Sequence, residues 1–210
     1  GIRDYKVTGV QTCALPILDI NLIYVVIYSY ILGSIPFGLI LTKIFLKQDL
    51  REIGSGNIGA TNALRTGKKS LGFATLLLDG LKGYLAVLIT TNIDPSLIFL
   101  SGLICFLGHI FPAWLKFKGG KGIAVYLGVL FAFSLKLGFL FIISWLIILY
   151  LSKYSSLSSL ISSLIIFLYS LFEYDLNQSI FYFIIFIIII YSHRENLERL
   201  KNKTENKIKF

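Results

Sequence analysis

The sequence predicts an all-α integral membrane protein with seven transmembrane helices, its N-terminus outside the cytoplasm and its C-terminus in the cytoplasm. Hydrophobic residues make up 56% of the 210 residues and charged residues only 15%, and the mean hydropathy is +0.79, far above the range of soluble domains. The apolar residues form long runs, and most basic residues lie between those runs, as in cytoplasmic loops of membrane proteins. We therefore attribute the net charge of +9 to these loops and not to nucleic-acid binding.

The first 17 residues are left out of this prediction. The chain contains no methionine, and residues 7–17, VTGVQTCALPI, resemble the conceptual translation of a common sequencing adapter. A cleaved signal peptide would need an apolar stretch of about 7–15 residues behind a basic end, which this segment lacks. We expect residues 1–17, with Cys13, to be a library artefact, and residues 18–210 to form a single membrane domain.

Seven apolar runs provide the candidate spans, because a helix needs about 20 mostly apolar residues to cross a bilayer. The predicted spans are Ile20–Phe45, Leu71–Ile89, Leu97–Leu115, Ile123–Leu135, Leu137–Leu151, Leu157–Phe172 and Ile180–Tyr191. The last four are short, and SLKLG, residues 134–138, divides the fourth span from the fifth. Within the first run, GSIPFG places Pro36 between glycines, which predicts a kink or a close packing site.

The distribution of positive charge decides the number of spans. With seven spans and an outside N-terminus, 16 of the 20 Lys and Arg residues fall in inside loops or the C-terminal tail, whereas the outside loops hold Asp94, Glu173 and Asp175. Merging the fourth and fifth spans would move the basic tail to the opposite face, against the positive-inside rule. Seven spans place all three long polar segments on the cytoplasmic face, where they can form one site.

The first polar segment, GSGNIGATNALR (residues 54–65), has the composition of an anion-binding loop. Its glycines allow consecutive backbone N–H groups to point into one concavity. Neutral donors come from four side chains, those of Ser55, Asn57, Thr61 and Asn62. Arg65 adds a forked cation suited to phosphate. The segment lacks the Walker pattern, and the alternative interpretation is a flexible loop that caps a helix.

The second polar segment, GHIFPAWLKFKGGKG (residues 108–122), combines glycines with Lys118 and Lys121 behind Pro112, which ends or bends the third span. It predicts a second concavity for an anion; the alternative is an ordinary positive-inside turn.

The third segment, HRENLERL (residues 193–200), is followed by Glu205. If it is helical, His193, Asn196 and Leu197 share one face. A juxtamembrane basic anchor would explain its cations but not His193 and Asn196.

Asp79, Lys82 and His109 fall well inside predicted spans, where charge is costly. Asp79 and Lys82 are three apart, so they can pair, and we favour a structural pair over a catalytic one. His109 is a functional candidate, and a neutral histidine that holds a neighbouring helix is the alternative. Cys105 lacks metal or disulfide spacing, and no Ser-His-Asp or metal-ligand cluster is evident, so no cofactor and no metal are predicted.

Together these motifs resemble the integral-membrane acyl-phosphate:glycerol-3-phosphate acyltransferases, the PlsY family. The resemblance extends from Leu22 to Glu205 and rests on the order of GSIPFG, GSGNIGATNALR, LDGLKG, GHIFPAWLKFKGGKGIA and HRENLERL. It implies seven membrane helices, an outside N-terminus and an active site on the cytoplasmic face of a bacterial plasma membrane. The tail departs from the pattern, because Lys203 stands where the family usually has a glycine.

The resemblance also implies the site residues. The catalytic residues are expected to be Ser55, Arg65, Lys121, His193 and Asn196. The expected phosphate-binding set comprises Ser55, Gly56, Asn57, Gly59, Thr61, Asn62, Arg65, Lys118, Gly119, Gly120, Lys121, Ser156 and Glu205.

The implied reaction transfers a fatty acyl group from acyl phosphate, and not from acyl-CoA or acyl carrier protein, to the 1-hydroxyl of glycerol-3-phosphate. Its products are lysophosphatidic acid and inorganic phosphate. Two phosphorylated substrates need two anion pockets, and two glycine-cation loops are present. His193 and a substrate phosphate oxygen both remain as the base.

The rival hypothesis is a transporter or channel for an organic phosphate anion. Transport usually needs a site near the membrane midplane, whereas these loops lie on one face, and the two halves show no clear internal repeat. A purely structural membrane protein gives no reason for GSGNIGATN.

Overall fold

The structure, a computed structural model, describes residues 20–208, so the predicted artefact at residues 1–17 lies outside the described residues. Within this range the chain is helical, with no strand. The helices are α1 (Ile20–Gly33), α2 (Phe37–Leu46), α3 (Ala60–Leu64), α4 (Lys69–Ile93), α5 (Ile98–Ile110), α6 (Ile123–Phe133), α7 (Leu135–Ser152), α8 (Ser155–Glu173), α9 (Leu176–Ser192) and α10 (Arg194–Lys201). Short 3-10 turns occupy Leu50–Glu52, Pro95–Leu97 and Ala113–Leu115.

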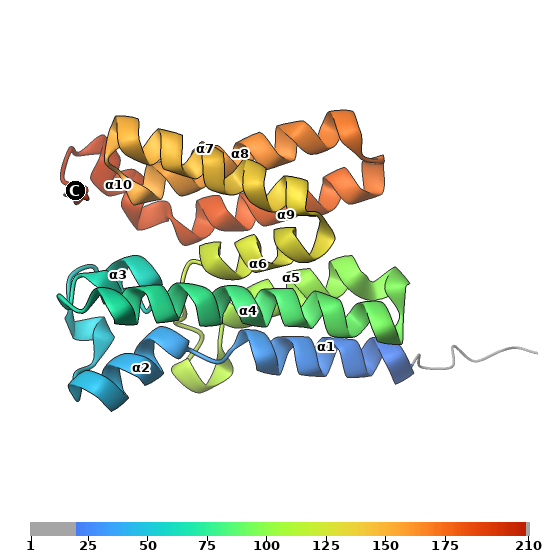
Figure 1. The fold of residues 1–210 in the computed structure, drawn as a ribbon, viewed down its shortest axis with the longest axis horizontal. Helices are drawn as coiled ribbons and strands as arrows, with labels where there is room; N and C mark the ends of the chain where they lie inside the picture. Colours follow the sequence, from blue (N-terminus) through green and yellow to red (C-terminus); the bar gives the residue numbers. More distant parts are fainter. Residues whose placement is uncertain (1–19, 209–210) are drawn as a thin grey trace, which may run out of the picture.

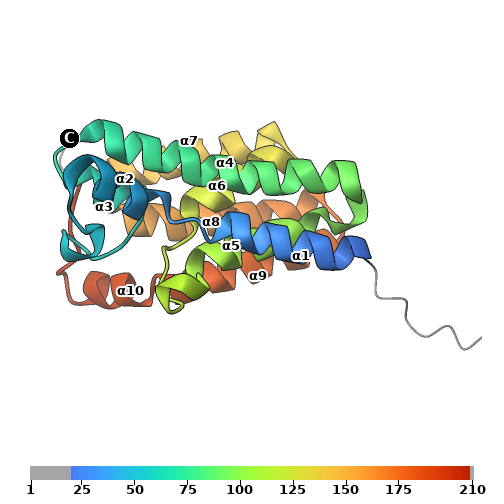
Figure 2. The same cartoon turned by 90° about the horizontal axis from the view of Figure 1, so that it is seen from below.

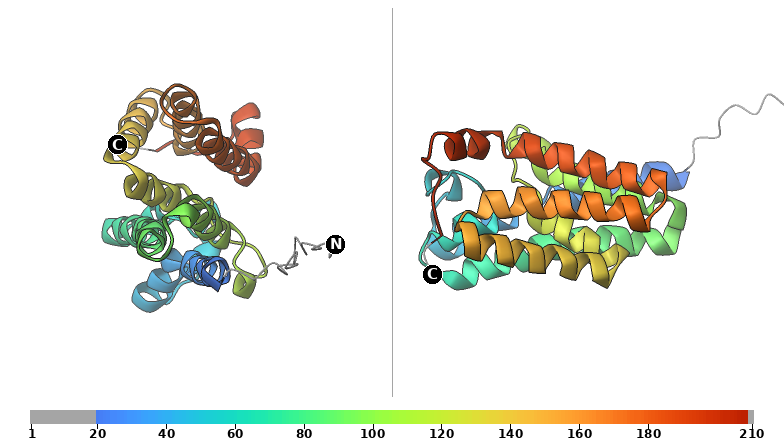
Figure 3. Two further views of the ribbon diagram at one scale, coloured as in Figure 1. Left: turned by 90° about the vertical axis from the view of Figure 1, so that its right-hand side faces the viewer. Right: turned by 90° about the horizontal axis from the view of Figure 1, so that it is seen from above.

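The long helices run side by side in two groups. One group consists of α1, α2, α4 and α5, the other consists of α7, α8 and α9, and α6 lies between them against α4 and α7 (Figures 1 and 3). α2, α3 and α10 gather at one end of the bundle, and α1 begins at the opposite end (Figures 1 and 2). The three polar segments are therefore together at one end, as the sequence predicts.

Among the described residues, five segments are long and apolar enough to cross a membrane, namely Ile20–Leu46, Lys69–Ile93, Pro95–Leu115, Leu135–Ser152 and Ser155–Glu173. α9 and α10 make a sixth if they are taken as one span bent by 60°. α6 has only 11 residues, fewer than the about 20 that a span needs. The all-α multi-pass prediction agrees with this, while seven spans and the orientation of the termini stay predictions.

The helix ends follow local signals that apolar run length does not capture. The first predicted span breaks at Ser34–Pro36, where Pro36 supplies no backbone N–H. α9 begins at Leu176 and not at Ile180, because Asp175 caps it by accepting from the backbone N–H of Gln178 at 2.8 Å. The predicted division between the fourth and fifth runs is present: Ser134 ends α6 and caps α7 by accepting from Lys136 N.

The inside of the bundle is packed, and its outside stays apolar. Phe106, Tyr126 and Phe141 are at most 2% exposed, and Tyr126 packs against both phenylalanine rings. On the outer surface Ile147 is 55% exposed and Phe172 is 90% exposed. Large apolar side chains exposed all along the helices have a lipid environment as their natural solvent.

Candidate active site

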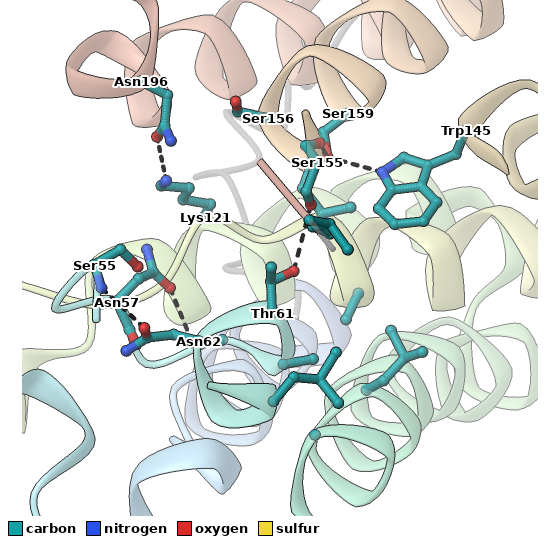
Figure 4. A pocket seen from close by; sticks show the side chains of 18 of the residues that line it. Ser55, Asn57, Thr61, Asn62, Lys121, Trp145, Ser155, Ser156, Ser159 and Asn196 are labelled. Atoms are coloured by element: carbon teal, nitrogen blue, oxygen red, sulfur yellow. Dashed lines mark hydrogen bonds between the residues drawn. The ribbon is translucent and has the colours of Figure 1, made fainter. Parts of the chain in front are cut away.

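The three polar segments meet at a cavity of about 420 Å³. Residues of the first segment, of the Lys121 turn, of the α8 N-terminus and of the α9–α10 junction all line it (Figure 4). Eleven predicted site residues line the cavity: Ser55, Asn57, Gly59, Thr61, Asn62, Arg65, Lys121, Ser156, His193, Asn196 and Glu205. Gly56, Lys118, Gly119 and Gly120 are outside this lining.

The first segment is folded around one buried side chain, Asn62, which is 2% exposed. The two hydrogens of its Nδ2 are shared among three backbone carbonyl oxygens at 2.7 to 3.0 Å, those of Leu50, Ile53 and Asn57. Its Oδ1 accepts from the backbone N–H of Ser55 at 2.9 Å. Both ends of the amide are thus engaged within the loop. We reassign Asn62 from binding phosphate to holding the loop in shape.

Gly54 allows this loop to close. It has φ of +57°, and a Cβ there would lie 2.5 Å from Asn62 Oδ1, so any side chain would collide with the amide that organises the loop.

The backbone N–H groups of the first segment are mostly engaged within it. Besides Ser55 N, the N–H of Gly56 donates to Ile53 O at 3.0 Å, and the N–H of Gly59 donates to Asn57 Oδ1 at 2.9 Å. The N–H groups of Ser55, Gly56 and Gly59 are therefore used within the loop, and a phosphate cradle formed by the rest of the segment's backbone stays a prediction. Among the side chains of this segment that line the cavity, Arg65 is the cation.

The second segment contributes Lys121, whose Nζ donates to Asn196 Oδ1 (Figure 4). Burial, with the nearby Arg199 guanidinium, lowers the pKa of Lys121 to about 8. Gly119 and Gly120 lie behind it, because their N–H groups donate to Ile110 O at 3.0 Å and His109 O at 3.1 Å. These glycines support the turn and do not bind through the backbone, and Lys118 is exposed outside the cavity.

The third segment supplies His193 at the 60° bend where α9 ends and α10 begins. His193 is 2% exposed, and burial, followed by the charge of Lys121, lowers its pKa to about 4. Its Nδ1 lies 2.9 Å from Ile189 O. A carbonyl oxygen only accepts, so the neutral ring carries its proton on Nδ1 and presents an Nε2 lone pair.

Glu205 ties the tail of the chain to this site. Its carboxylate accepts from Ser156 Oγ at 2.9 Å, from Asn196 Nδ2 at 2.7 Å and from Arg199 Nε at 2.8 Å. Burial opposes its ionisation, but the hydrogen bonds from these three side chains outweigh burial and hold the pKa of Glu205 below its ordinary value. A carboxylate repels phosphate, so Glu205 and its partner Ser156 are better assigned to positioning Asn196 and Arg199.

Arg199 and Ser155 are two of the polar lining residues that were absent from the predicted site. Arg199 is the third cation of the cavity, and it follows Asn196 by three residues on α10, so helical spacing could have identified it. Ser155 opens α8, and its hydroxyl lies 3.4 Å from that of Thr61 (Figure 4). This second contact needed the tertiary structure, since 94 positions separate the two residues.

Much of the remaining cavity wall is apolar. α4 contributes Phe73 and Leu76, and α7 contributes Ile142, Trp145 and Leu146. The cavity therefore joins a cationic end to a hydrocarbon-like wall, an arrangement suited to a molecule with an anionic head and an apolar tail. Within residues 20–208 no group of three or more His, Cys, Asp or Glu side chains could hold a metal ion.

Comparison with known proteins gives one consistent result. A family model described as glycerol-3-phosphate acyltransferase matches residues 23–203. The glycerol-3-phosphate acyltransferase of Pelagibacter ubique (strain HTCC1062) is 60% identical over 186 residues, covering 89% of this chain and 97% of that protein. The one from Bradyrhizobium diazoefficiens is 48% identical over 183 residues, covering 87% of this chain and 92% of that protein.

Solved structures agree with the sequence relatives. A crystal structure of PlsY, an integral membrane glycerol 3-phosphate acyltransferase, in its glycerol 3-phosphate form has a TM-score of 0.85 at 38% identity and covers 89% of this chain and 95% of that chain. The lysophosphatidic acid form of PlsY has a TM-score of 0.82 at 37% identity, with the same coverage.

Proposed function

This chain belongs to the glycerol-3-phosphate acyltransferase family, and from that premise we propose that it moves a fatty acyl group from acyl phosphate to the 1-hydroxyl of glycerol-3-phosphate. The products would be lysophosphatidic acid and inorganic phosphate. The observation that carries the proposal is a single cavity that joins three cations, Arg65, Lys121 and Arg199, to an apolar wall. One end suits the phosphates of both substrates, and the wall suits the acyl chain.

The reaction does not require a covalent intermediate with the protein. The acceptor hydroxyl oxygen bonds to the carbonyl carbon of the acyl phosphate, the bond between that carbon and the phosphate oxygen breaks, and phosphate leaves with the bonding electrons. A mixed anhydride already has a good leaving group, so no nucleophilic side chain is required. Holding the hydroxyl against the carbonyl and balancing phosphate charge are the contributions we assign to this site.

The hydroxyl proton has two possible destinations. His193 Nε2 carries a lone pair, and a phosphate oxygen of a substrate is the alternative. The lowered pKa of His193, about 4, makes it a weak base whose neutral form persists across the physiological range.

The variant His193→Ala distinguishes the two. If His193 is the base, turnover falls by about 100-fold or more with little change in glycerol-3-phosphate affinity. Turnover within about threefold of wild type would assign the proton to the substrate phosphate.

The location follows from the same premise. This is a multi-pass membrane protein of a family represented in bacteria. We propose that the end with the polar segments faces the cytoplasm, because the basic residues concentrate there.

The deciding experiment is phosphate release by the purified protein in detergent. Release that requires both acyl phosphate and glycerol-3-phosphate supports the proposal, and lysophosphatidic acid should appear in equal amount. A transporter for organic phosphate would bind glycerol-3-phosphate without releasing phosphate from the donor. Formation of lysophosphatidic acid from acyl-CoA, which frees coenzyme A and no phosphate, but not from acyl phosphate would overturn the proposed donor.

A further inference from the structure

A buried ionic cluster borders the cavity, and two of its members, Asp79 and His109, are among the residues that line it. Asp79 and Lys82 of α4 are each 1% exposed, and His109 of α5 is 5% exposed. Lys82 Nζ lies 2.9 Å from Asp79 Oδ1, which agrees with the predicted pair. Ionisable side chains inside a membrane protein are costly and need a compensating role.

Lys82 reaches beyond Asp79 to two other segments. Its Nζ donates to Ile35 O at 2.6 Å and contacts His109 Nδ1 at 2.9 Å. An ammonium has donors and no acceptor, so Ile35 O and His109 Nδ1 both accept from Lys82, and Asp79 is its ion-pair partner. His109 Nδ1 is then the acceptor, and the neutral ring carries its proton on Nε2.

The contact with Ile35 leads to the first polar segment. Ile35 lies in the break between α1 and α2, so the ammonium fixes the point at which α2 begins. At the start of α2, Gly38 lies so close to Ile58 O that a Cβ there would be 2.1 Å from it. Ile58 is at the centre of GSGNIGATNALR and is 2% exposed.

The contact with His109 leads to the second polar segment. The Nε2 end of the ring faces Gly120, where a Cβ would lie 2.1 Å from Nε2. Gly120 N donates to His109 O at 3.1 Å, so both the ring and the backbone of His109 hold this turn. The next residue along the chain is Lys121.

We propose that Lys82, with Asp79 as its counter-ion and His109 as its second arm, is a positioning residue that fixes the two anion-binding loops relative to each other. One ammonium contacts the supports of both loops, and its effect on the reaction passes through Lys121 and the first segment. What the loops bind rests on the proposed function; that Lys82 links them rests on the contacts alone.

The test must separate positioning from stability. Replacing a buried ion pair by apolar or neutral residues of similar volume is often neutral for folding, whereas removing one partner strands a charge. We therefore choose the paired variant Asp79→Asn/Lys82→Met. We expect kcat to fall at least tenfold per folded protein, with the thermal midpoint in detergent close to wild type. The matched control is Lys136→Met/Glu173→Gln, an exposed ion pair of 2.8 Å between the start of α7 and the end of α8, which should keep kcat within twofold.

A double-mutant cycle with Lys121→Ala distinguishes positioning from a purely structural role, because only positioning makes the loss of kcat depend on Lys121. If Lys82 acts through Lys121, the tenfold loss from the paired variant shrinks to about threefold or less in the Lys121→Ala background. Equal losses in both backgrounds overturn the inference, and so does a lowered thermal midpoint with unchanged kcat. If the paired variant does not fold, His109→Leu, which keeps the Asp79–Lys82 pair, takes its place with the same expected cycle.

Failure of the proposed function would look different. If wild-type protein releases no phosphate from acyl phosphate and glycerol-3-phosphate, the proposed reaction is wrong, and the inference is judged by calorimetric binding of glycerol-3-phosphate. A tenfold weaker affinity in the paired variant sustains the positioning role, and equal affinity overturns it.

Discussion

At the scale of single residues, the cationic end of the cavity carries more positive charge than its own carboxylate neutralises, and a bound anion would balance it. Arg65, Lys121 and Arg199 all line the cavity, and Glu205 is the one carboxylate among the described residues that contacts this group through hydrogen bonds. Arg199 is paired with Glu205 at 2.8 Å, which leaves Arg65 and Lys121 for substrate. A buried ammonium and a forked guanidinium are the two phosphate binders that proteins use most.

Removing either cation should therefore slow the reaction. We expect Arg65→Ala and Lys121→Ala each to lower kcat/KM at least tenfold, equivalent to about 1.4 kcal/mol of transition-state stabilisation. The exposed Lys118→Ala, three positions from Lys121, serves as the control and should stay within twofold. Wild-type turnover in both cation variants would show that the phosphates bind elsewhere.

The pKa of Lys121 predicts a pH dependence. Because burial lowers that pKa to about 8, the substrate-free protein loses this charge as pH rises through 8. Bound phosphate favours the charged ammonium and raises its pKa, so binding above pH 8 must take up a proton. Affinity for glycerol-3-phosphate should hold steady between about pH 7 and 8 and then fall by up to about tenfold per pH unit.

Titration calorimetry of Lys121→Arg provides the comparison, since a guanidinium stays charged throughout this range. The decline above pH 8 should disappear in that variant. If Lys121→Arg shows the same decline as wild type, another group is responsible.

Residue types were predicted from the sequence more reliably than their roles. Ser55, Arg65, Lys121, His193 and Asn196 do converge on one cavity. Asn62, Gly120 and Glu205 are engaged with the protein itself. A donor's partner depends on how the loop folds, and composition carries no information about which donors are already used.

At the scale of elements, α10 is held over the cavity by the tail that follows it. Glu205 contacts Asn196 and Arg199 on α10 and Ser156 on α8, and Ile208 N donates to Lys153 O at 2.8 Å. The tail thus crosses from α10 to the start of α8, and it orients Asn196 toward Lys121. Hydropathy had described this region only as a basic tail.

Glu205→Gln should loosen the contacts by which residue 205 holds α10 against the start of α8. The neutral amide would lack the charge that holds Arg199, and charge-assisted hydrogen bonds contribute about 1.5–3 kcal/mol each, so we expect kcat/KM to fall at least tenfold. Glu198→Gln, an exposed carboxylate on the same helix, should have no effect beyond twofold. Hydrogen exchange of α10 by mass spectrometry should speed up in the first variant alone; unchanged kinetics and exchange would refute the role of Glu205.

Helix positions were predictable because lipid demands apolar runs, whereas helix interruptions were not fully predictable. The break at Pro36 could be anticipated from GSIPFG, but its stabilisation by Lys82, 47 positions away from Ile35, could not. The length of α6 was not predictable either. Its sequence is as apolar as that of a span, but the helix has only 11 residues and is too short to be one.

At the scale of the whole molecule, the three polar segments share one end of the bundle while α1 begins at the other (Figure 1). Their shared end is a property of the fold, and which compartment it faces is a prediction from charge. Together the two statements predict that the proposed phosphate-binding groups all face the cytoplasm.

Labelling with an impermeant maleimide checks this orientation. In a background without cysteine, Lys69→Cys and Glu198→Cys should react only after the cells are permeabilised, and Asn92→Cys at the far end of α4 should react in intact cells. All three positions are exposed. Reaction of Lys69→Cys and Glu198→Cys from opposite sides would exclude a shared site.

The short helix α6 has one further consequence. Eleven residues of helix extend about 16 Å, roughly half of the hydrocarbon thickness, and α6 begins well inward of the end where α3 and α10 lie (Figure 1). Lys121, just ahead of α6, is therefore recessed from bulk water. If an acyl donor binds there as proposed, this recession would limit its contact with water and so favour ester formation over hydrolysis.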